Sequence, residues 1–218
     1  MAGETLFLLR LWAPSLFLLL VGCGSMPSGL VDAASRGDVA QVRRLLDDGA
    51  DVNERDAQGR TAVTAAALGD HVEVARALIS AGADVDAQDS DRNNALLVTG
   101  ETGSVPMLRE VLKASPDLGA TNRYGGVAVI PASDRSHVEY VREILKTGID
   151  VDHVNRLGWT ALLEAVILGD GGPVHQEIVR LLVDAGADRA IADEDGVTAL
   201  EHARERGYAE MVRILEGG

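Results

Sequence analysis

The sequence predicts an all-α fold, a solenoid of about six stacked helix pairs with protruding finger loops. Turn residues suited to end a helix recur every 33 residues, and once after 38, at Gly49, Gly82, Ser115, Gly148 and Gly186. Residues placed to start a helix recur at the same intervals, at Thr61, Asn94, Val127, Thr160 and Thr198. Only 3% of the 218 residues are aromatic, so a core of Ala, Val, Leu and Ile suits stacked small helices better than one large globule.

The first 22 residues differ from the rest and are similar to a bacterial lipoprotein signal peptide. A mostly apolar run over residues 6–20 ends in LVGC, which resembles the lipobox whose small residues admit a lipid-transferring enzyme and a peptidase. Cleavage would make Cys23, the only cysteine of the chain, the lipid-bearing N-terminus. Residues 23–29 would then be the lipidated N-terminus and a short tether. An uncleaved signal anchor and an ordinary secretory peptide with a spectator cysteine are the alternatives.

The residue after the cysteine bears on the expected location. Gly24 in place of Asp favours the outer over the inner membrane in enterobacterial sorting. We therefore expect a lipid-anchored protein of the bacterial cell envelope that faces the periplasm from the outer membrane.

Residues 153–188 show the repeated pattern most clearly. Thr160 can cap a first helix over residues 161–168, and a second helix with one broad apolar face follows from about Gln176. Gly186 then ends the second helix. The same pattern predicts helix pairs near residues 30–48, 61–81, 94–114, 127–147, 160–185 and 198–216.

This pattern resembles the ankyrin repeat, which consists of a polar loop with D and G, then T-P-L-H, two alanines, G-H, E-V-V, L-L and G-A-D. Residues 59–89 carry it as GRTAVTAAALGDHVEVARALISAGADVDAQD, and the resemblance covers residues 30–216. It implies an ankyrin repeat domain over residues 30–218, with repeats at about 30–58, 59–91, 92–124, 125–157, 158–195 and 196–218. It also implies that the finger loops and first helices line a concave face that binds proteins.

Repeats 3 and 4 depart furthest from the pattern. Arg92 replaces a loop glycine, Gly100 lies inside a helix and Val127 cannot cap one. Pro131 removes an amide donor about one turn into its helix. Because the stability of a solenoid is a sum of repeat and neighbour contributions, we expect this middle to open first.

The two central finger tips combine an arginine with exposed aromatic or apolar residues, types that are enriched at interface hot spots. The predicted protein-binding residues are therefore Arg123, Tyr124, Arg156, Leu157 and Trp159. Trp159 has the alternative role of covering a neighbouring finger.

Repeat 5 contains five extra residues, DGGPV, between its two helices. Insertions in repeats map to surface loops and are often functional. We therefore regard Asp170, Gly171, Gly172 and Pro173 as an accessory loop that its glycines make mobile, with tolerated sequence drift as the alternative.

Nothing in the sequence predicts catalysis, a metal site or a cofactor. Glu164 and Glu201 are expected at equivalent positions of adjacent repeats, where a carboxylate pair could do acid/base work or bind a small ligand. The simpler alternative is that each accepts hydrogen bonds from a helix N-terminus or meets water. The chain lacks the G-x-S-x-G, H-E-x-x-H and phosphate-loop motifs, so we expect no enzyme.

The formal net charge of −14 argues against nucleic acid and favours a cationic protein partner, although a solvated acidic surface is the simpler explanation. We expect a membrane-anchored, monomeric scaffold that binds an unidentified protein. One use is that of an immunity-type inhibitor of a toxin or lipase. The alternative is an assembly or protective factor for an envelope enzyme.

Overall fold

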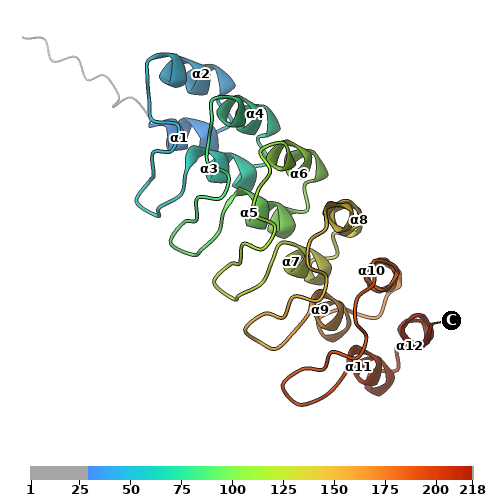
Figure 1. The fold of residues 1–218 in the computed structure, drawn as a ribbon. Helices are drawn as coiled ribbons and strands as arrows, with labels where there is room; N and C mark the ends of the chain where they lie inside the picture. Colours follow the sequence, from blue (N-terminus) through green and yellow to red (C-terminus); the bar gives the residue numbers. More distant parts are fainter. Residues whose placement is uncertain (1–28, 218) are drawn as a thin grey trace, which may run out of the picture.

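Twelve short α-helices, arranged as six antiparallel pairs, make up residues 29–217, the part of the chain that the computed structural model describes (Figure 1). The first helices of the pairs are α1 (Leu30–Ser35), α3 (Ala62–Leu68), α5 (Ala95–Thr102), α7 (Val129–Asp134), α9 (Ala161–Ile167) and α11 (Ala199–Glu205). The second helices are α2 (Val39–Asp47), α4 (Val72–Ser80), α6 (Val105–Leu112), α8 (Val138–Ile144), α10 (Pro173–Asp184) and α12 (Ala209–Glu216). A 3₁₀ turn, η1 (Leu145–Thr147), extends α8.

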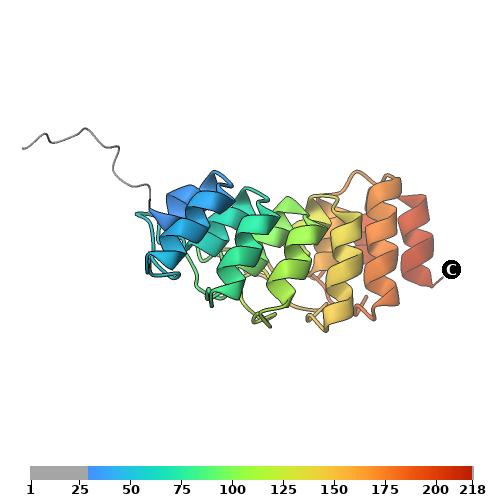
Figure 2. The ribbon, with the colours of Figure 1, turned by 90° about the horizontal axis from the view of Figure 1, so that it is seen from above.

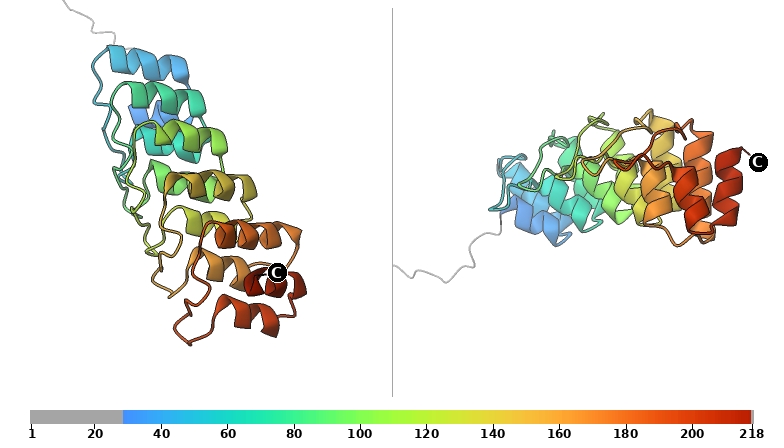
Figure 3. Two further views of the ribbon diagram at one scale, coloured as in Figure 1. Left: turned by 45° about the vertical axis from the view of Figure 1, so that its right-hand side comes forward. Right: turned by 90° about the horizontal axis from the view of Figure 1, so that it is seen from below.

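The helices form two rows, an inner row of first helices and an outer row of second helices (Figure 1). Figure 2 looks onto the outer row, whose helices lie side by side. Each helix packs on its neighbours in the same row and on the other helix of its own pair. The finger loops all project from one side of the stack (Figures 1 and 3). Described residues belong to helices, turns and loops, with only two isolated β-bridges, so the predicted all-α solenoid is confirmed.

Small apolar residues allow the inner helices to lie close together. In α3 the residues at positions 62–67 are all buried, and four of them are alanine. The one fully buried aromatic residue of the described part is Tyr140 in α8. Its hydroxyl donates to Thr99 of α5 at 2.8 Å, and the Thr99 hydroxyl donates to the Leu96 carbonyl at 2.6 Å. This contact ties repeat 4 to repeat 3.

The inner helices start where the sequence predicts, because a capping side chain satisfies a free backbone amide. Thr61, Asn94, Thr160 and Thr198 each accept from the amide three residues later. Repeat 4 lacks such a cap, as expected from Val127.

Pro131 alters the start of α7. In repeat 5 the amide of Glu164 donates to the Thr160 carbonyl at 2.9 Å, and four other repeats make the equivalent bond. Pro131 occupies that position without an amide, and the Val127 carbonyl accepts from Ile130 at 3.0 Å instead. The assigned helix accordingly begins at Val129 and is only six residues long.

Gly100 has a different role from the one its helix propensity suggests. A Cβ atom at this position would lie 2.2 Å from the Ala128 carbonyl oxygen of the next repeat. Gly100 is therefore required for the close approach of α5 to repeat 4, and it is not merely a weak point of its helix.

Two residues of repeat 3 adopt a left-handed conformation where other repeats have glycine. Arg92 has φ 62° and Ser115 has φ 54°. The fold therefore retains the turn geometry in both loops, at the backbone cost that a Cβ atom imposes in this region.

Ion pairs join successive outer helices. Each consists of an arginine from one repeat and a glutamate from the next, in the pairs Arg76–Glu110, Arg109–Glu143, Arg142–Glu177 and Arg180–Glu210. We call this series the arginine–glutamate ladder. Hydrogen bonds from Arg76 and Lys113 hold the pKa of Glu110 at about 2.

One prediction for repeat 5 needs correction, and the predictions for the first 28 residues lie outside the described part. Helix α10 begins at Pro173 and not near Gln176, because proline is well suited to the first position of a helix. The signal peptide, Cys23 and residues 24–28 lie outside the described residues. Within residues 29–217 no helix is long and apolar enough to cross a membrane.

Substituting Gly100 by Ala should lower the free energy of unfolding by about 2 kcal/mol, because the added methyl group must displace the Ala128 carbonyl. In an unconstrained helix the same change stabilises by about 0.5–1 kcal/mol. Urea denaturation followed by circular dichroism measures the difference.

Gly119→Ala is the matched control, since its Cβ atom would meet only the Asp117 carboxylate oxygen at 3.3 Å. We expect it to change stability by less than about 0.5 kcal/mol. A Gly100→Ala protein as stable as the wild type would contradict the close approach.

Candidate functional site

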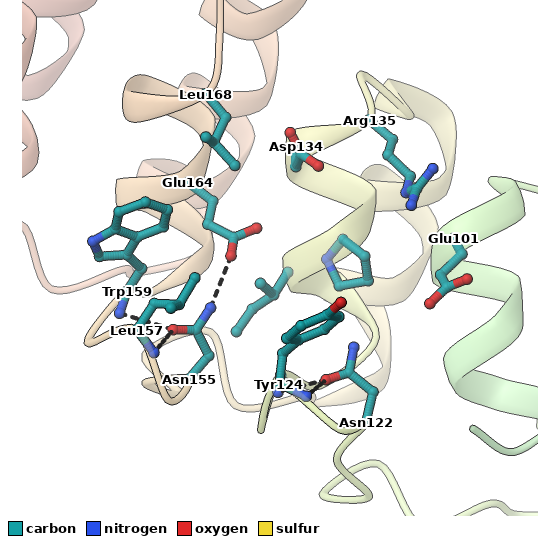
Figure 4. Close-up of a pocket in the computed structure, with 13 residues that line it drawn as sticks. Glu101, Asn122, Tyr124, Asp134, Arg135, Asn155, Leu157, Trp159, Glu164 and Leu168 are labelled. Carbon is teal, nitrogen blue, oxygen red and sulfur yellow. Dashed lines mark hydrogen bonds between the residues drawn. The ribbon is translucent and has the colours of Figure 1, made fainter. Parts of the chain in front are cut away.

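A hollow of about 210 Å³ lies between the finger loops that lead into the inner helices α7 and α9 (Figure 4). We name each finger by the repeat whose first helix it leads into, so these two are the fingers of repeats 4 and 5. We call it the finger pocket. Its large apolar side chains are Tyr124, Leu157, Trp159 and Leu168, and Ile130 and Pro131 of α7 complete the apolar lining. Tyr124, Leu157 and Leu168 are each about half exposed, at 53%, 52% and 49%. An apolar surface open to solvent therefore surrounds this hollow.

Three of the five predicted protein-binding residues, Tyr124, Leu157 and Trp159, line the finger pocket. Trp159 is half-buried and packs against the core, whereas the other two stand in solvent. The structure therefore brings these three side chains together from two neighbouring fingers. Their role in binding stays a prediction.

The two predicted arginines brace the finger tips instead of lining the pocket. Arg123 pairs with Asp91 at 3.0 Å and donates to the Tyr124 hydroxyl at 2.8 Å. Its guanidinium carbon lies 4.8 Å from the centre of the Tyr124 ring. Arg156 donates to the Arg123 carbonyl at 2.9 Å, and its amide donates to the Tyr124 carbonyl at 2.9 Å. These bonds hold Tyr124 in place beside the hollow.

An asparagine or aspartate shapes each finger tip by accepting two backbone amides. In repeat 5 the Asn155 oxygen accepts from Leu157 at 2.9 Å and from Trp159 at 3.1 Å. Asn122 does the same for Tyr124 and Gly126. Repeats 2, 3 and 6 have Asp at this position, whereas repeats 4 and 5 have Asn, which adds a side-chain donor.

Asn155 uses this donor to bind Glu164 on the floor of the finger pocket. Its side-chain amide donates to Glu164 Oε1 at 2.8 Å. Glu164 is only 7% exposed, and its Oε2 atom has no hydrogen-bond partner among the described residues. In Figure 4 this second oxygen points into the hollow.

The environment of Glu164 favours its protonated form. Burial raises the pKa of its carboxyl to about 7, with a further contribution from the negative charge of Asp134, while the hydrogen bond from Asn155 opposes the shift. A carboxyl group that titrates near neutral pH inside a concave site is a functional candidate on physical grounds.

The predicted equivalence of Glu164 and Glu201 is wrong by one residue. Glu201 is three residues after its cap Thr198, and its carboxylate accepts from the Thr198 amide and hydroxyl, both at 2.8 Å. Glu164 is four residues after its cap and corresponds to His202. The residue of repeat 5 that corresponds to Glu201 is Leu163, which is buried, whereas Glu201 in the last described helix pair is exposed. A one-residue step turns a side chain about 100° around the helix, so Glu164 lies on a different side of α9 from Leu163. The two carboxylates therefore form no equivalent pair.

The predicted accessory loop is tied to repeat 6. Gly171 has φ 74°, and a Cβ atom there would lie 2.4 Å from the Tyr208 ring, whose hydroxyl donates to the Gly169 carbonyl at 3.1 Å. Asp170 accepts from the Gly172 amide at 2.8 Å, and Pro173 is already helical. The inserted residues thus extend the start of α10 and pack against the next repeat.

Sequence reasoning missed Asn155, Asp134 and Leu168 as parts of one site. The replacement of Asp by Asn at two finger tips is the only sequence signal that could have indicated it. Among residues 29–217 no group of three or more His, Cys, Asp or Glu side chains is placed to hold a metal ion.

The chain belongs to the ankyrin repeat family. Family models described as "Ankyrin repeats (many copies)" and "Ankyrin repeats (3 copies)" match residues 30–79 and, in two overlapping matches, residues 98–189 and 132–217. The ankyrin repeat protein YahD of Escherichia coli (strain K12) is 50% identical over 54 residues, which is 25% of this chain and 27% of YahD.

Solved ankyrin structures have the same fold. An ankyrin repeat domain from Acinetobacter baumannii AYE is 45% identical with a TM-score of 0.83, over 86% of this chain and 95% of that domain. The ankyrin repeat protein EF0377 is 38% identical with a TM-score of 0.84, over 89% and 99%. The ankyrin repeat domain of Bcl-3, a member of the IkappaB protein family, is 28% identical with a TM-score of 0.78, over 88% and 86%.

Substituting Glu164 by Gln should stabilise the protein at pH 8 by up to about 3 kcal/mol and leave it unchanged at pH 4. Below the usual carboxyl pKa of 4.5 the wild-type group is protonated in the folded and the unfolded chain. As the pH rises from there to about 7, the unfolded chain ionises first and the folded state loses stability. Chemical denaturation at the two pH values measures the effect.

Glu201→Gln is the control with the opposite sign. Hydrogen bonds from Thr198 lower the pKa of Glu201, so its removal should cost stability at pH 8 and not at low pH. If Glu164→Gln behaves like Glu201→Gln, the buried carboxyl is ionised without penalty and the assignment is wrong.

Proposed function

We propose that this chain is a lipid-anchored scaffold of the bacterial cell envelope that binds a protein partner, as a monomer, through the fingers and inner helices of repeats 4 and 5. The ankyrin repeat family supports the general part of this proposal, because its members generally act as non-enzymatic scaffolds for protein interactions. The lipobox at Cys23 supports the envelope location. The net charge of −14 favours a cationic partner.

The single observation that carries the binding site is the exposed apolar surface around the finger pocket. Tyr124 and Leu157 present large apolar side chains to solvent on adjacent fingers, and Trp159, which also lines the pocket, packs partly buried against the core. Arg123 and Arg156 fix the tips, so little side-chain entropy remains to be lost when a partner binds. Braced aromatic side chains beside a hollow are the usual composition of an interface hot spot.

Two uses of such a scaffold compete. An immunity-type protein would inhibit a toxin or lipase, and an assembly or protective factor would support an envelope enzyme. Activity of the captured partner decides between them, because the first use lowers it and the second preserves or raises it.

Replacing Tyr124, Leu157 and Trp159 together by Ala should reduce crosslinked capture of the partner at least tenfold, since the loss of about 3 kcal/mol at a hot spot corresponds to more than a hundredfold in affinity. The measurement is quantitative mass spectrometry on envelope fractions of the native host that contain the full chain. Circular dichroism checks that the helices are retained.

Leu68→Ala combined with Val174→Ala is the matched control, because it removes exposed apolar side chains outside the two central fingers, at 42% and 45% exposure. We expect capture to be unchanged in this double variant. Retained capture by the triple variant would place the interface elsewhere on the solenoid.

Cys23→Ala should release the protein from the membrane fraction and abolish incorporation of a radiolabelled fatty acid. A single buried acyl chain binds weakly, so stable retention needs the several chains of a lipoprotein anchor. Unchanged fractionation together with an unlabelled wild type would exclude the anchor and leave the binding surface unaffected.

A further inference from the structure

The finger pocket combines an apolar entrance with a buried acid at its floor. Tyr124, Leu157 and Leu168 surround the opening, and Glu164 lies below them with one carboxylate oxygen unpartnered and directed into the hollow (Figure 4). This oxygen accepts no hydrogen bond from the described residues, although the side chain as a whole is only 7% exposed. A ligand that brings a donor on an apolar stem would satisfy both parts of the pocket.

The charged groups around the pocket favour a cation at this acceptor. Asp134 and Arg135 of α7 and Glu101 of α5 line the hollow together with Glu164, which gives three carboxyl groups against one guanidinium. Arg135 is exposed at the end of α7. A cation at the floor of the finger pocket is therefore surrounded by more negative than positive groups.

The titratable groups on the other helices packed against α9 are already engaged. On α10, His175 contacts Asp170 at 3.1 Å, and Glu177 pairs with Arg142 and Arg180. On α11, Glu201 is held by its capping bonds, and His202 contacts Asp193 at 2.6 Å. Glu164 is therefore the buried carboxyl group of this region that has an oxygen without a hydrogen-bond partner.

The volume fits one side chain and not a larger organic molecule. Pockets that hold drug-sized ligands span about 300–1,000 Å³, whereas the finger pocket measures about 210 Å³. Lysine and arginine bury an apolar stem and carry a cationic head that donates several hydrogen bonds.

We propose that the finger pocket receives one lysine or arginine side chain of the protein partner, with the free oxygen of Glu164 as its acceptor and the Tyr124, Leu157 and Trp159 side chains around its stem. This inference rests on the proposed protein-binding function and specifies the partner chemistry at its centre. Binding of the cation favours the ionised carboxylate, so the complex releases a proton near neutral pH.

The test is a titration of the ¹⁵N-labelled full chain in neutral detergent with capped tripeptides that carry lysine, arginine, norleucine or glutamate between two glycines. The lysine or arginine peptide should shift the Trp159 indole and Asn155 side-chain resonances in a saturable way at millimolar concentration. The norleucine and glutamate peptides should bind at least roughly tenfold more weakly, because they lack the charge-assisted hydrogen bond. Affinity should fall about tenfold between pH 8 and pH 5.5, as the carboxyl group becomes protonated.

Glu164→Gln should remove the preference for the cationic peptides and its pH dependence, while Glu201→Gln should retain both. Equal binding of the norleucine peptide, stronger binding of the glutamate peptide, an unchanged lysine affinity in Glu164→Gln, or no shift with either cation would each overturn the proposal. Such a failure leaves the docking function of the fingers intact, because the triple alanine variant and partner capture test that separately.

Discussion

Each helix pair in this chain can bury its apolar face only against the pairs before and after it, and the rest of the structure depends on this constraint. It requires backbones to approach closely, which the buried alanines of α3 and the missing Cβ of Gly100 allow. It also explains how the irregular repeats 3 and 4 remain in the stack. The Pro131 start and the uncapped α7 weaken local helix formation. The Tyr140–Thr99 bond and the tight contact at Gly100 supply packing between the same repeats.

The finger pocket depends on two sequence features, one in the finger tips and one in α7, which meet where repeats 4 and 5 pack against each other. Asn replaces Asp at the tips of repeats 4 and 5, so Asn155 can donate to a carboxyl group that an aspartate would repel. Pro131 and Ile130 of α7 then provide an apolar wall beside the same group and reduce its exposure to water. A residue that would meet solvent in an isolated repeat thereby becomes a buried acid. The site belongs to neither repeat alone, which is typical of the concave surfaces that solenoids use for recognition.

The sequence was sufficient to predict the helix pairs, since period, caps and apolar faces are local properties that agree in every repeat. It was insufficient where a one-residue shift in the alignment of the repeats changes the position of a side chain around its helix. Leu162 and Leu163 offer two alignments with the repeat pattern, and the choice between them decides whether Glu164 corresponds to Glu201 or to His202. Similarly, the DGGPV insertion contains both turn residues and a proline suited to start a helix, and only packing against Tyr208 selects the helix. Exposure of Tyr124 and Leu157 was predictable, but the hollow between them depends on how two repeats meet.

The arginine–glutamate ladder on the outer helices has a direction. At each of its four junctions the cation comes from the earlier repeat and the anion from the later one. Any repeat stacked in the reverse order would place like charges opposite each other, which costs free energy where the groups are partly buried. The pairs therefore distinguish the two edges of a repeat. The leading edge faces the preceding repeat and carries the glutamate, and the trailing edge faces the following repeat and carries the arginine. A duplicated or transplanted repeat joins this array without repulsion only when it carries its glutamate on the leading edge and its arginine on the trailing edge.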